Sequence, residues 1–313
     1  MINTLFSSVW TERYRPKTMD DIVLGKENKT FISELSRKGE IPNLMLASSP
    51  GTGKSSIAKI IVNSILDCQY LYINASEENG INDIRSKVMT FAQTMSIDSK
   101  IKVVILDECD YLSINAQAAL RNVMEEFLGT TRFILTCNYP LKVIPALHSR
   151  CQELDMTPPF EGVVARCIHI LKAEGVTVPE QTKPQLVQLI KNAYPDVRKC
   201  INRLQKSVID NVLIISETNN AVEFAEEVLS LLMQKKKDLM EIRKIIIDNE
   251  TNFNNDYHDL LRSLFDCVYN SNIAPDKKRM AMLAVSEGMY RHSQVLDQEI
   301  NAFSCVLTLS EII

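Results

Sequence analysis

A glycine-rich turn carries the clearest chemistry in this sequence. Residues 50–55 read PGTGKS and stand between a short apolar run and a segment with helical periodicity. In such a turn, backbone N–H groups point inward at a polyphosphate, the lysine neutralises its charge and the serine hydroxyl ligates Mg²⁺. These roles would fall to Lys54 and Ser55. The full motif has a glycine where this chain has Ser48, so a chance glycine-rich turn is the alternative.

Two adjacent acids follow a second apolar run. Residues 103–106 read VVIL and lead directly into Asp107 and Glu108. A buried strand ending in these acids would place Asp107 beside the Mg²⁺ held by Ser55, and Glu108 would orient or deprotonate an attacking water. Paired acids at a strand end can also be a solvated turn. Together with the glycine-rich turn, however, they make an ATPase the leading hypothesis.

Asn138 follows a further apolar run at residues 133–136. A lone asparagine in this position is usually a turn residue. Beside a nucleotide it would hold the attacking water or sense the γ-phosphate.

Alternating strands and helices must position these residues. Apolar runs of strand length at 44–47, 70–73, 102–106 and 133–136 alternate with segments whose apolar residues recur every three or four positions. This alternation predicts an α/β domain with a parallel sheet covered by helices. After Pro158 and Pro159 only helical periods are visible, one of them running to Val208, with a polar break at residues 217–220. We therefore expect domains at residues 1–156, 157–216 and 217–313, the last two helical.

Composition and charge exclude several other classes of protein. The 313 residues are 45% hydrophobic and 24% charged, as in ordinary globular chains, and no run approaches the roughly 18 apolar residues of a membrane span. The net charge of −4 gives no general attraction to nucleic acid or acidic membranes, so any DNA contact would be local. The eight cysteines include no CxxC pair, which favours buried thiols in a reducing compartment over disulfides or zinc. Because the first residues show no secretory signal pattern, we expect a cytoplasmic protein.

Several segments carry a family resemblance that covers most of the chain. They are residues 10–23 (WTERYRPKTMDDIV), 71–85 (LYINASEENGINDIR), 116–125 (AQAALRNVME), Asn138 with 148–151 (HSRC), and 195–198 (PDVR) with 202–205 (NRLQ). They resemble the AAA+ clamp-loader subunits of the replication-factor-C type. Ser48, the length and the C-terminal third resemble more closely the large ATPase subunit of tailed-phage clamp loaders. The resemblance implies an AAA+ P-loop domain, then a helical lid and an all-helical collar that forms oligomers.

The resemblance also implies further residues around bound ATP and Mg²⁺. Arg198 would reach from the lid onto the γ-phosphate, and Arg150 would enter the ATP site of an adjacent subunit as an arginine finger. The alternative for Arg198 is an arginine on the surface of a helix. The alternative for residues 11–14 is an ordinary N-terminal tether packed on the sheet. The expected catalytic residues are Lys54, Glu108, Asn138, Arg150 and Arg198, and the expected Mg²⁺ ligands are Ser55 and Asp107. The residues expected to bind ATP are Thr11, Glu12, Arg13, Tyr14, Val23, Gly51, Thr52, Gly53, Lys54, Ser55, Ser56 and Arg198.

DNA contact is expected on two helices that face DNA in the family. The candidates are Arg85, Lys87, Asn115 and Arg121, and a solvated basic face is the alternative. Gln117 is a hypothetical link between DNA and the Asp107–Glu108 region. The lysine run at 235–237 is expected to be a solvated face.

The resemblance implies ATP-dependent loading of a sliding clamp onto primer–template DNA during replication, in a host cytoplasm if the gene is viral. The implied partners are a different clamp-loader subunit in a hetero-pentamer, the clamp, primer–template DNA and a single-strand-binding protein, with no membrane. One alternative is another AAA+ DNA motor for branch migration or helicase loading, which would not explain residues 10–23 and 148–151 together. The other is a non-catalytic nucleotide-binding scaffold, against which Glu108 argues.

Overall fold

The computed structural model describes residues 8–38, 41–77, 81–94, 101–215, 221–234, 238–253, 256–292 and 294–313. The chain divides into two compact units, residues 1–215 and 216–313, and each is described by itself. Within the described ranges, no helix has the length and apolar character needed to span a membrane.

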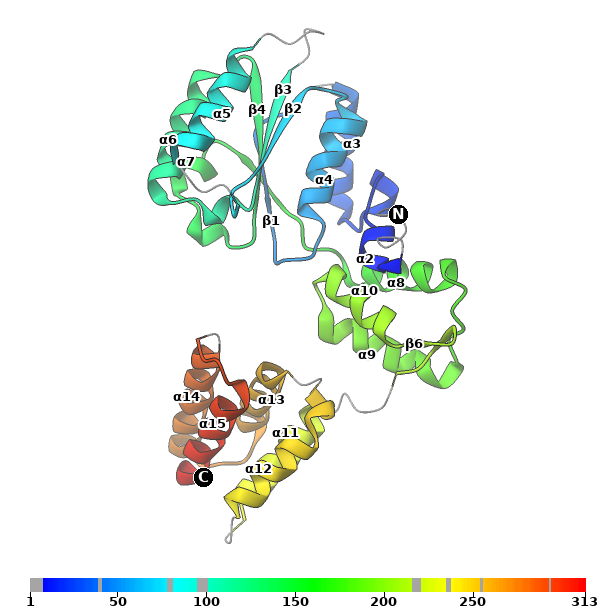
Figure 1. Ribbon diagram of the computed structural model, residues 1–313, viewed down its shortest axis with the longest axis vertical. Coiled ribbons are helices and arrows are strands. Elements are labelled where there is room, and N and C mark those ends of the chain that lie inside the picture. Colours follow the sequence, from blue (N-terminus) through cyan, green and yellow to red (C-terminus); the bar gives the residue numbers. More distant parts are fainter. Residues whose placement is uncertain are drawn as a thin grey trace. The chain divides into compact units, whose positions relative to one another are not determined.

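A parallel sheet lies at the centre of the first unit (Figure 1). Its strands are β1 (Leu44–Ala47), β2 (Tyr70–Asn74), β3 (Lys102–Asp107), β4 (Thr131–Cys137) and β5 (Gln152–Asp155), in the order β2-β3-β4-β1-β5. β1 and β3 are buried along their whole length, as expected for central strands covered on both faces. The predicted parallel α/β sheet is confirmed. β5 was not predicted, because only Leu154 of its four residues is buried and its sequence has no apolar run.

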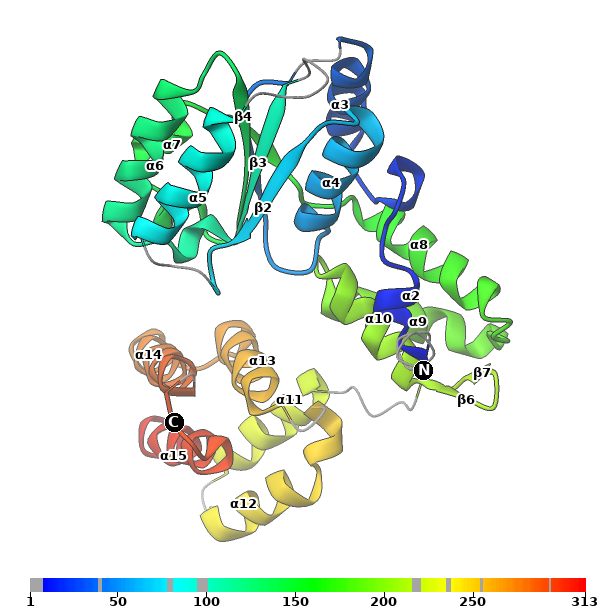
Figure 2. The same cartoon turned by 45° about the horizontal axis from the view of Figure 1, so that its top comes forward.

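Helices cover both faces of this sheet (Figures 1 and 2). One face carries α3 (Lys26–Lys38) and α4 (Lys54–Ile60), which continues as a π-helical turn to Ile65. The other carries α5 (Ile81–Gln93), α6 (Ile114–Glu126) and the short α7 (Pro145–His148). Each face has its own apolar core. The helical pattern predicted through Met95 agrees with α5, and Met95 itself lies outside the described residues.

A second, helical layer of the first unit follows β5. It contains α8 (Phe160–Ala173), α9 (Lys183–Ala193) and α10 (Val197–Lys206), which pack around a separate core, and a hairpin of β6 (Val208–Ile209) and β7 (Val212–Leu213). The helical assignment of Val208 was wrong. Asp210 and Asn211 both have positive φ, 47° and 61°, and two such residues form the tight turn that favours a hairpin over a longer helix.

The N-terminal segment, residues 8–24, joins both layers of this unit. It begins with α2 (Trp10–Arg13), and the indole of Trp10 is buried in the helical core. The backbone N–H of Trp10 also donates to Oε1 of Gln205 on α10 over 2.9 Å. Further along, Ile22 and Leu24 are buried in the core between the sheet and α3 and α4.

The described residues of the second unit form helices and the segments that connect them. It comprises α11 (Ala221–Leu232), α12 (Leu239–Asp248), α13 (Tyr257–Asn270), α14 (Pro275–His292) and α15 (Gln298–Ile312), with a 3₁₀ turn at Glu250–Phe253. These helices share one apolar core, and aspartates cap the N-termini of α12, α13 and α15. The predicted helical C-terminal region is therefore confirmed. The polar break at 217–220 and the lysine run at 235–237 lie outside the described residues.

Candidate nucleotide-binding site

The glycine-rich turn connects β1 to α4 and requires glycine at two positions. Gly51 has φ +76° and Gly53 has φ +99°, values that side-chain-bearing residues rarely adopt. Gly51 also faces the helical layer closely, because a methyl group added there would lie 1.8 Å from Oδ1 of Asp196. The backbone N–H of Arg198 donates to the Gly51 carbonyl over 3.3 Å. The turn and the start of α10 are therefore in direct contact.

The Lys54 side chain is buried and folds back over the turn. Its Nζ donates to the carbonyls of Ser48 and Ser49 over 2.9 and 2.7 Å. Ser48 stands where the full motif has glycine, and its hydroxyl lies 2.5 Å from that of Thr52. Burial lowers the pKa of Lys54, although nearby acids partly offset this. An anionic phosphate would favour the charged ammonium, as the predicted role requires.

Asp107 ends β3 and accepts hydrogen bonds from three sides. Its Oδ1 accepts from Oγ of Ser55, over 2.8 Å, and from the hydroxyl of Thr136 on β4. Its Oδ2 accepts from the hydroxyl of Tyr72 on β2, over 2.6 Å. The structure thus brings together the two residues predicted to bind Mg²⁺. A hydroxyl and a carboxylate are the hard oxygen donors that Mg²⁺ prefers, so the donor set fits the ion.

Glu108 adopts an unusual backbone conformation directly after the strand. Its φ of +56° and ψ of 43° lie in the left-handed region, and its N–H donates to the Thr136 hydroxyl over 3.0 Å. A non-glycine residue held in this region costs free energy and is typical of functional sites. Asn138 follows β4, and its N–H donates to Oδ1 of the buried Asp110 over 3.2 Å.

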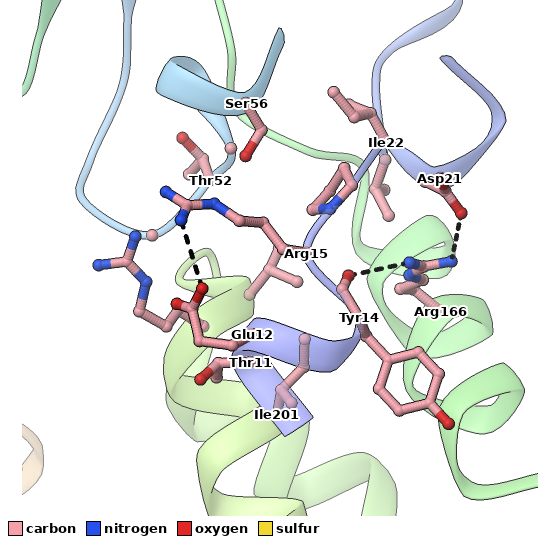
Figure 3. A pocket seen from close by; sticks show the side chains of 16 residues that line it. Thr11, Glu12, Tyr14, Arg15, Asp21, Ile22, Thr52, Ser56, Arg166 and Ile201 are labelled. Carbon is pink, nitrogen blue, oxygen red and sulfur yellow. Dashed lines mark hydrogen bonds and ion pairs between the residues drawn. The ribbon is translucent and has the colours of Figure 1, made fainter. Parts of the chain in front are cut away.

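Two adjoining cavities surround the turn. The first, of about 480 Å³, is polar, and its lining includes Lys54, Ser55, Asp107, Glu108, Asn138 and Arg198. The second, of about 640 Å³, lies between the N-terminal segment, the turn and α10 (Figure 3). Its lining includes Thr11, Glu12, Tyr14, Val23, Gly51, Thr52, Gly53, Ser56 and Arg198. The first has the groups to hold phosphates, and the second adjoins it on the side of the N-terminal segment.

Most residues predicted to bind ATP line these cavities, but the Arg13 side chain points elsewhere. Arg13 donates to Glu174 at the end of α8 over 2.6 Å, and the Tyr14 hydroxyl donates to the same carboxylate over 2.6 Å. Arg13 does not belong to the described residues that line the two cavities. The sequence pattern of a four-residue helix could not show which of its side chains faces α8.

Arg15 and Arg166 line the second cavity and were missed. Arg15 also lines the first cavity and pairs with Glu12 over 3.3 Å. Arg166 of α8 donates to the Tyr14 carbonyl and to Asp21, so it joins the helical layer to the N-terminal segment (Figure 3). Arg15 stands inside the segment that carries the resemblance and could have been named, whereas Arg166 has no distinguishing pattern around it.

Arg150 is absent from the described lining of both cavities and lies just after α7. Its Nε donates to Oε1 of Glu125 over 2.9 Å, and its Nη1 donates to the Ala146 carbonyl over 2.8 Å. The hydrogen bond from Arg150 lowers the pKa of Glu125. Arg150 is thus held at a distinct site, away from the cavities of its own chain.

The DNA candidates lie on α5 and α6, on one face of the sheet (Figure 1). Lys87 and Asn115 are exposed, and Arg121 is half-buried and donates to the side chain of Asn122 over 2.8 Å. The side chain of Arg85 lies outside the described residues.

Gln117 is buried near the start of α6 and forms three hydrogen bonds. Its Nε2 donates to the carbonyls of Leu112 and Lys142, and its Oε1 accepts from the N–H of Ile144 over 2.7 Å. It therefore joins the segment after Glu108 to the segment that leads to α7 and Arg150.

The sheet, the glycine-rich turn and the acids at the end of β3 together define an AAA+ ATPase. Residues 44–158 match the ATPase family associated with various cellular activities, and residues 157–214 match the AAA+ ATPase lid domain of the sliding-clamp-loader large subunit. The replication factor C small subunit of Thermoplasma acidophilum is 32% identical, over 97% of this chain and 98% of the relative. That of Staphylothermus marinus is also 32% identical, over 94% and 93%. The chain belongs to the replication factor C small-subunit family of clamp-loader ATPases.

Solved structures support the fold alone. Two RuvB variants of Thermotoga maritima match with TM-scores of 0.53 and 0.54 at 18% and 15% identity, each covering 92% of this chain and 90% of the other. At this identity, the likeness is evidence of a shared AAA+ architecture and carries no argument about activity.

Proposed function

We propose that this ATPase binds ATP and Mg²⁺ between neighbouring subunits and uses hydrolysis to load a sliding clamp onto primer–template DNA. The observation that carries the proposal is the pairing of two adjoining cavities with an arginine, Arg150, held outside both. Such a chain would contain the residues that bind ATP at its own site and would present Arg150 as the arginine finger for the ATP site of a neighbouring subunit.

The polar cavity would hold the phosphates. Lys54 and the N–H groups of the turn would bind them, and Arg198 would approach from the start of α10. Ser55 and Asp107 would hold Mg²⁺, which supplies charge neutralisation at the β- and γ-phosphates. Glu108 would orient the attacking water and Asn138 would hold it in place.

The second cavity would hold the adenosine. Thr11, Glu12, Tyr14 and Val23 form part of its lining, and the N-terminal segment that contributes them is anchored in the helical layer by Trp10. We expect residues 157–216 to act as the lid over this site. Because the lid and the N-terminal segment are packed together, closure of the lid would shape the adenosine pocket.

Arg150 would complete the site of an adjacent subunit. An arginine finger stabilises charge in the transition state and contributes roughly 10³–10⁵ in turnover. The isolated chain would therefore hydrolyse ATP slowly. We propose that residues 217–313 form the collar of a hetero-pentamer with a different clamp-loader subunit.

ATP must bind more tightly to the state of the assembly that can hold the clamp. A ligand with equal affinity for all states would not shift the equilibrium between them. In this scheme ATP favours the state that binds clamp and DNA. DNA on α5 and α6 would complete the catalytic geometry, with Gln117 as the physical link to the Arg150 segment. Hydrolysis would then release the closed clamp.

The test is ATP turnover by the chain alone, then with its partner subunit, clamp and primed DNA. We expect full stimulation only with the complete set. The Glu108→Gln variant should still bind ATP but lose hydrolysis, whereas a scaffold would keep its function with this change. Stimulation by forks or duplex ends without any clamp would instead support a DNA motor.

A further inference from the structure

Tyr72 lies on the same side of the sheet as the magnesium-binding carboxylate. In the parallel pairing of β2 and β3, Tyr72 is opposite Ile105, so its side chain shares a face with Ile105 and Asp107. This is the face covered by α4, and Ile105 is buried in that core. Tyr72 and Asp107 are therefore diagonal neighbours on adjacent strands, within reach of a long side chain.

The phenol ring of Tyr72 is fixed from two directions. Nζ of Lys59 on α4 lies 4.2 Å from the ring centroid, a distance typical of a cation–π contact. The hydroxyl donates to Oδ2 of Asp107 over 2.6 Å. Burial and this hydrogen bond raise the pKa of Tyr72 above its ordinary value.

The two oxygens of Asp107 are thereby divided between different partners. Oδ1 faces the Ser55 hydroxyl at 2.8 Å, on the side of the glycine-rich turn, and Oδ2 faces Tyr72. With the hydroxyl of Tyr72 removed, Oδ2 would lose this donor, and only the hydroxyls of Ser55 and Thr136 at Oδ1 would still orient the carboxylate. Partners of this kind orient metal ligands, and their loss typically weakens metal binding roughly 10–100-fold.

We infer that Tyr72 is a positioning residue for the magnesium site, holding Asp107 so that Oδ1 is directed at the ion and at Ser55. This inference rests on the proposed ATP and Mg²⁺ site and adds a residue to it. Tyr72 acts through Asp107 and would contact neither nucleotide nor ion.

The test is binding of Mn²⁺, used as the probe ion, to the full chain in the presence of ADP, followed by electron paramagnetic resonance. Tyr72→Phe keeps the ring and its contact with Lys59 and removes only the hydroxyl. Tyr70→Phe is the matched control, because Tyr70 lies on the same strand and the same face but is more exposed. We expect Tyr72→Phe to weaken Mn²⁺ binding roughly tenfold and Tyr70→Phe to leave it unchanged.

Two further readouts separate positioning from a loss of structure. ADP affinity measured in EDTA should stay the same for both variants. Both ligand-free chains should still unfold cooperatively, with the melting temperature of Tyr72→Phe lowered only by the loss of one hydrogen bond. In turnover assays of the complete assembly, Tyr72→Phe should raise the Mg²⁺ concentration for half-maximal rate roughly tenfold and leave the rate at saturating Mg²⁺ nearly unchanged.

Unchanged Mn²⁺ affinity in Tyr72→Phe, or equal weakening in both variants, would overturn the inference while leaving the proposed site intact. If the unaltered chain itself bound no Mn²⁺ with ADP, the proposed nucleotide site would fail, and this inference with it.

Discussion

Arg150 and Glu125 form an ion pair that links the end of α7 to the end of α6, with Nε of Arg150 donating to Oε1 of Glu125 over 2.9 Å. Both side chains are partly exposed, at 32% and 52%. Exposed pairs of this kind contribute little to folding stability. The pair therefore orients the guanidinium but is weak enough to break. In the proposed assembly, Arg150 could exchange Glu125 for the phosphates of ATP bound to a neighbouring subunit.

Arg150→Ala should abolish most ATP turnover in the complete assembly. We expect a fall of roughly 10³–10⁵, because the transition-state charge at each neighbouring site would lose its arginine. The affinity of the isolated chain for ADP should not change, since Arg150 lies away from its own cavities. Arg279→Ala, which removes an exposed arginine of the second unit, is the control. If the isolated Arg150→Ala chain lost ADP affinity by as large a factor as the assembly lost turnover, Arg150 would not be acting on a neighbouring subunit.

Gly51→Ala should prevent nucleotide binding. The added methyl group would meet Oδ1 of Asp196 at 1.8 Å, and φ of +76° is unfavourable for alanine. The Asp196 side chain would have to turn away, which would break its hydrogen bond from the N–H of Lys199 at the start of α10 and disturb the contact between the turn and this helix. ADP binding by calorimetry checks this, with Gly129→Ala as the control because a methyl group there meets nothing within 4 Å. Normal ADP affinity in Gly51→Ala would show that the contact is not required.

Gln117→Ala should lower stability and uncouple DNA from ATP turnover. The side chain is 1% exposed, and its loss would leave the Leu112 and Lys142 carbonyls and the Ile144 N–H without this partner. Each buried group left unsatisfied costs about 1–3 kcal/mol. We expect a lower melting temperature and loss of DNA stimulation with clamp present. Gln188→Ala on the surface of α9 should change neither. If DNA still stimulated ATP turnover in the Gln117→Ala assembly, Gln117 would not link DNA to the Arg150 segment.

Docking of the N-terminal segment should weaken in acid. Burial alone would raise the pKa of Glu174, but hydrogen bonds from Tyr14 and Arg13 outweigh it and lower the pKa. A lowered pKa in the folded state means that this stabilisation is present above the unfolded value of about 4.3 and is lost as pH falls through the folded value.

Fluorescence of Trp10, the one tryptophan in the sequence, should report this docking. We expect Glu174→Gln to show weaker docking at neutral pH and a smaller change below about pH 4 than the unaltered chain. Glu180→Gln is the control, because its side chain is 88% exposed. Identical acid titrations of Glu174→Gln and the unaltered chain would contradict the prediction.

The sequence predicts the central strands well because burial on both faces requires uninterrupted apolar residues, as in β1 and β3. β5 escaped prediction because it is an edge strand with three exposed residues, and the β6–β7 hairpin because it depends on left-handed backbone at Asp210 and Asn211. The core of the site was also predictable, since Lys54, Asp107 and Glu108 adjoin the ends of recognisable elements. Tyr72 was not, because its role depends on strand register rather than on any local pattern.

Trp10 has a practical consequence for anyone who dissects the chain. Its indole fills the interior of a bundle whose other members lie more than 150 positions later, between Val163 and Leu213. A fragment that begins at Pro158 would lack this indole, and the interior of the bundle would be left open. Such pieces would be poor surrogates for the intact ATPase.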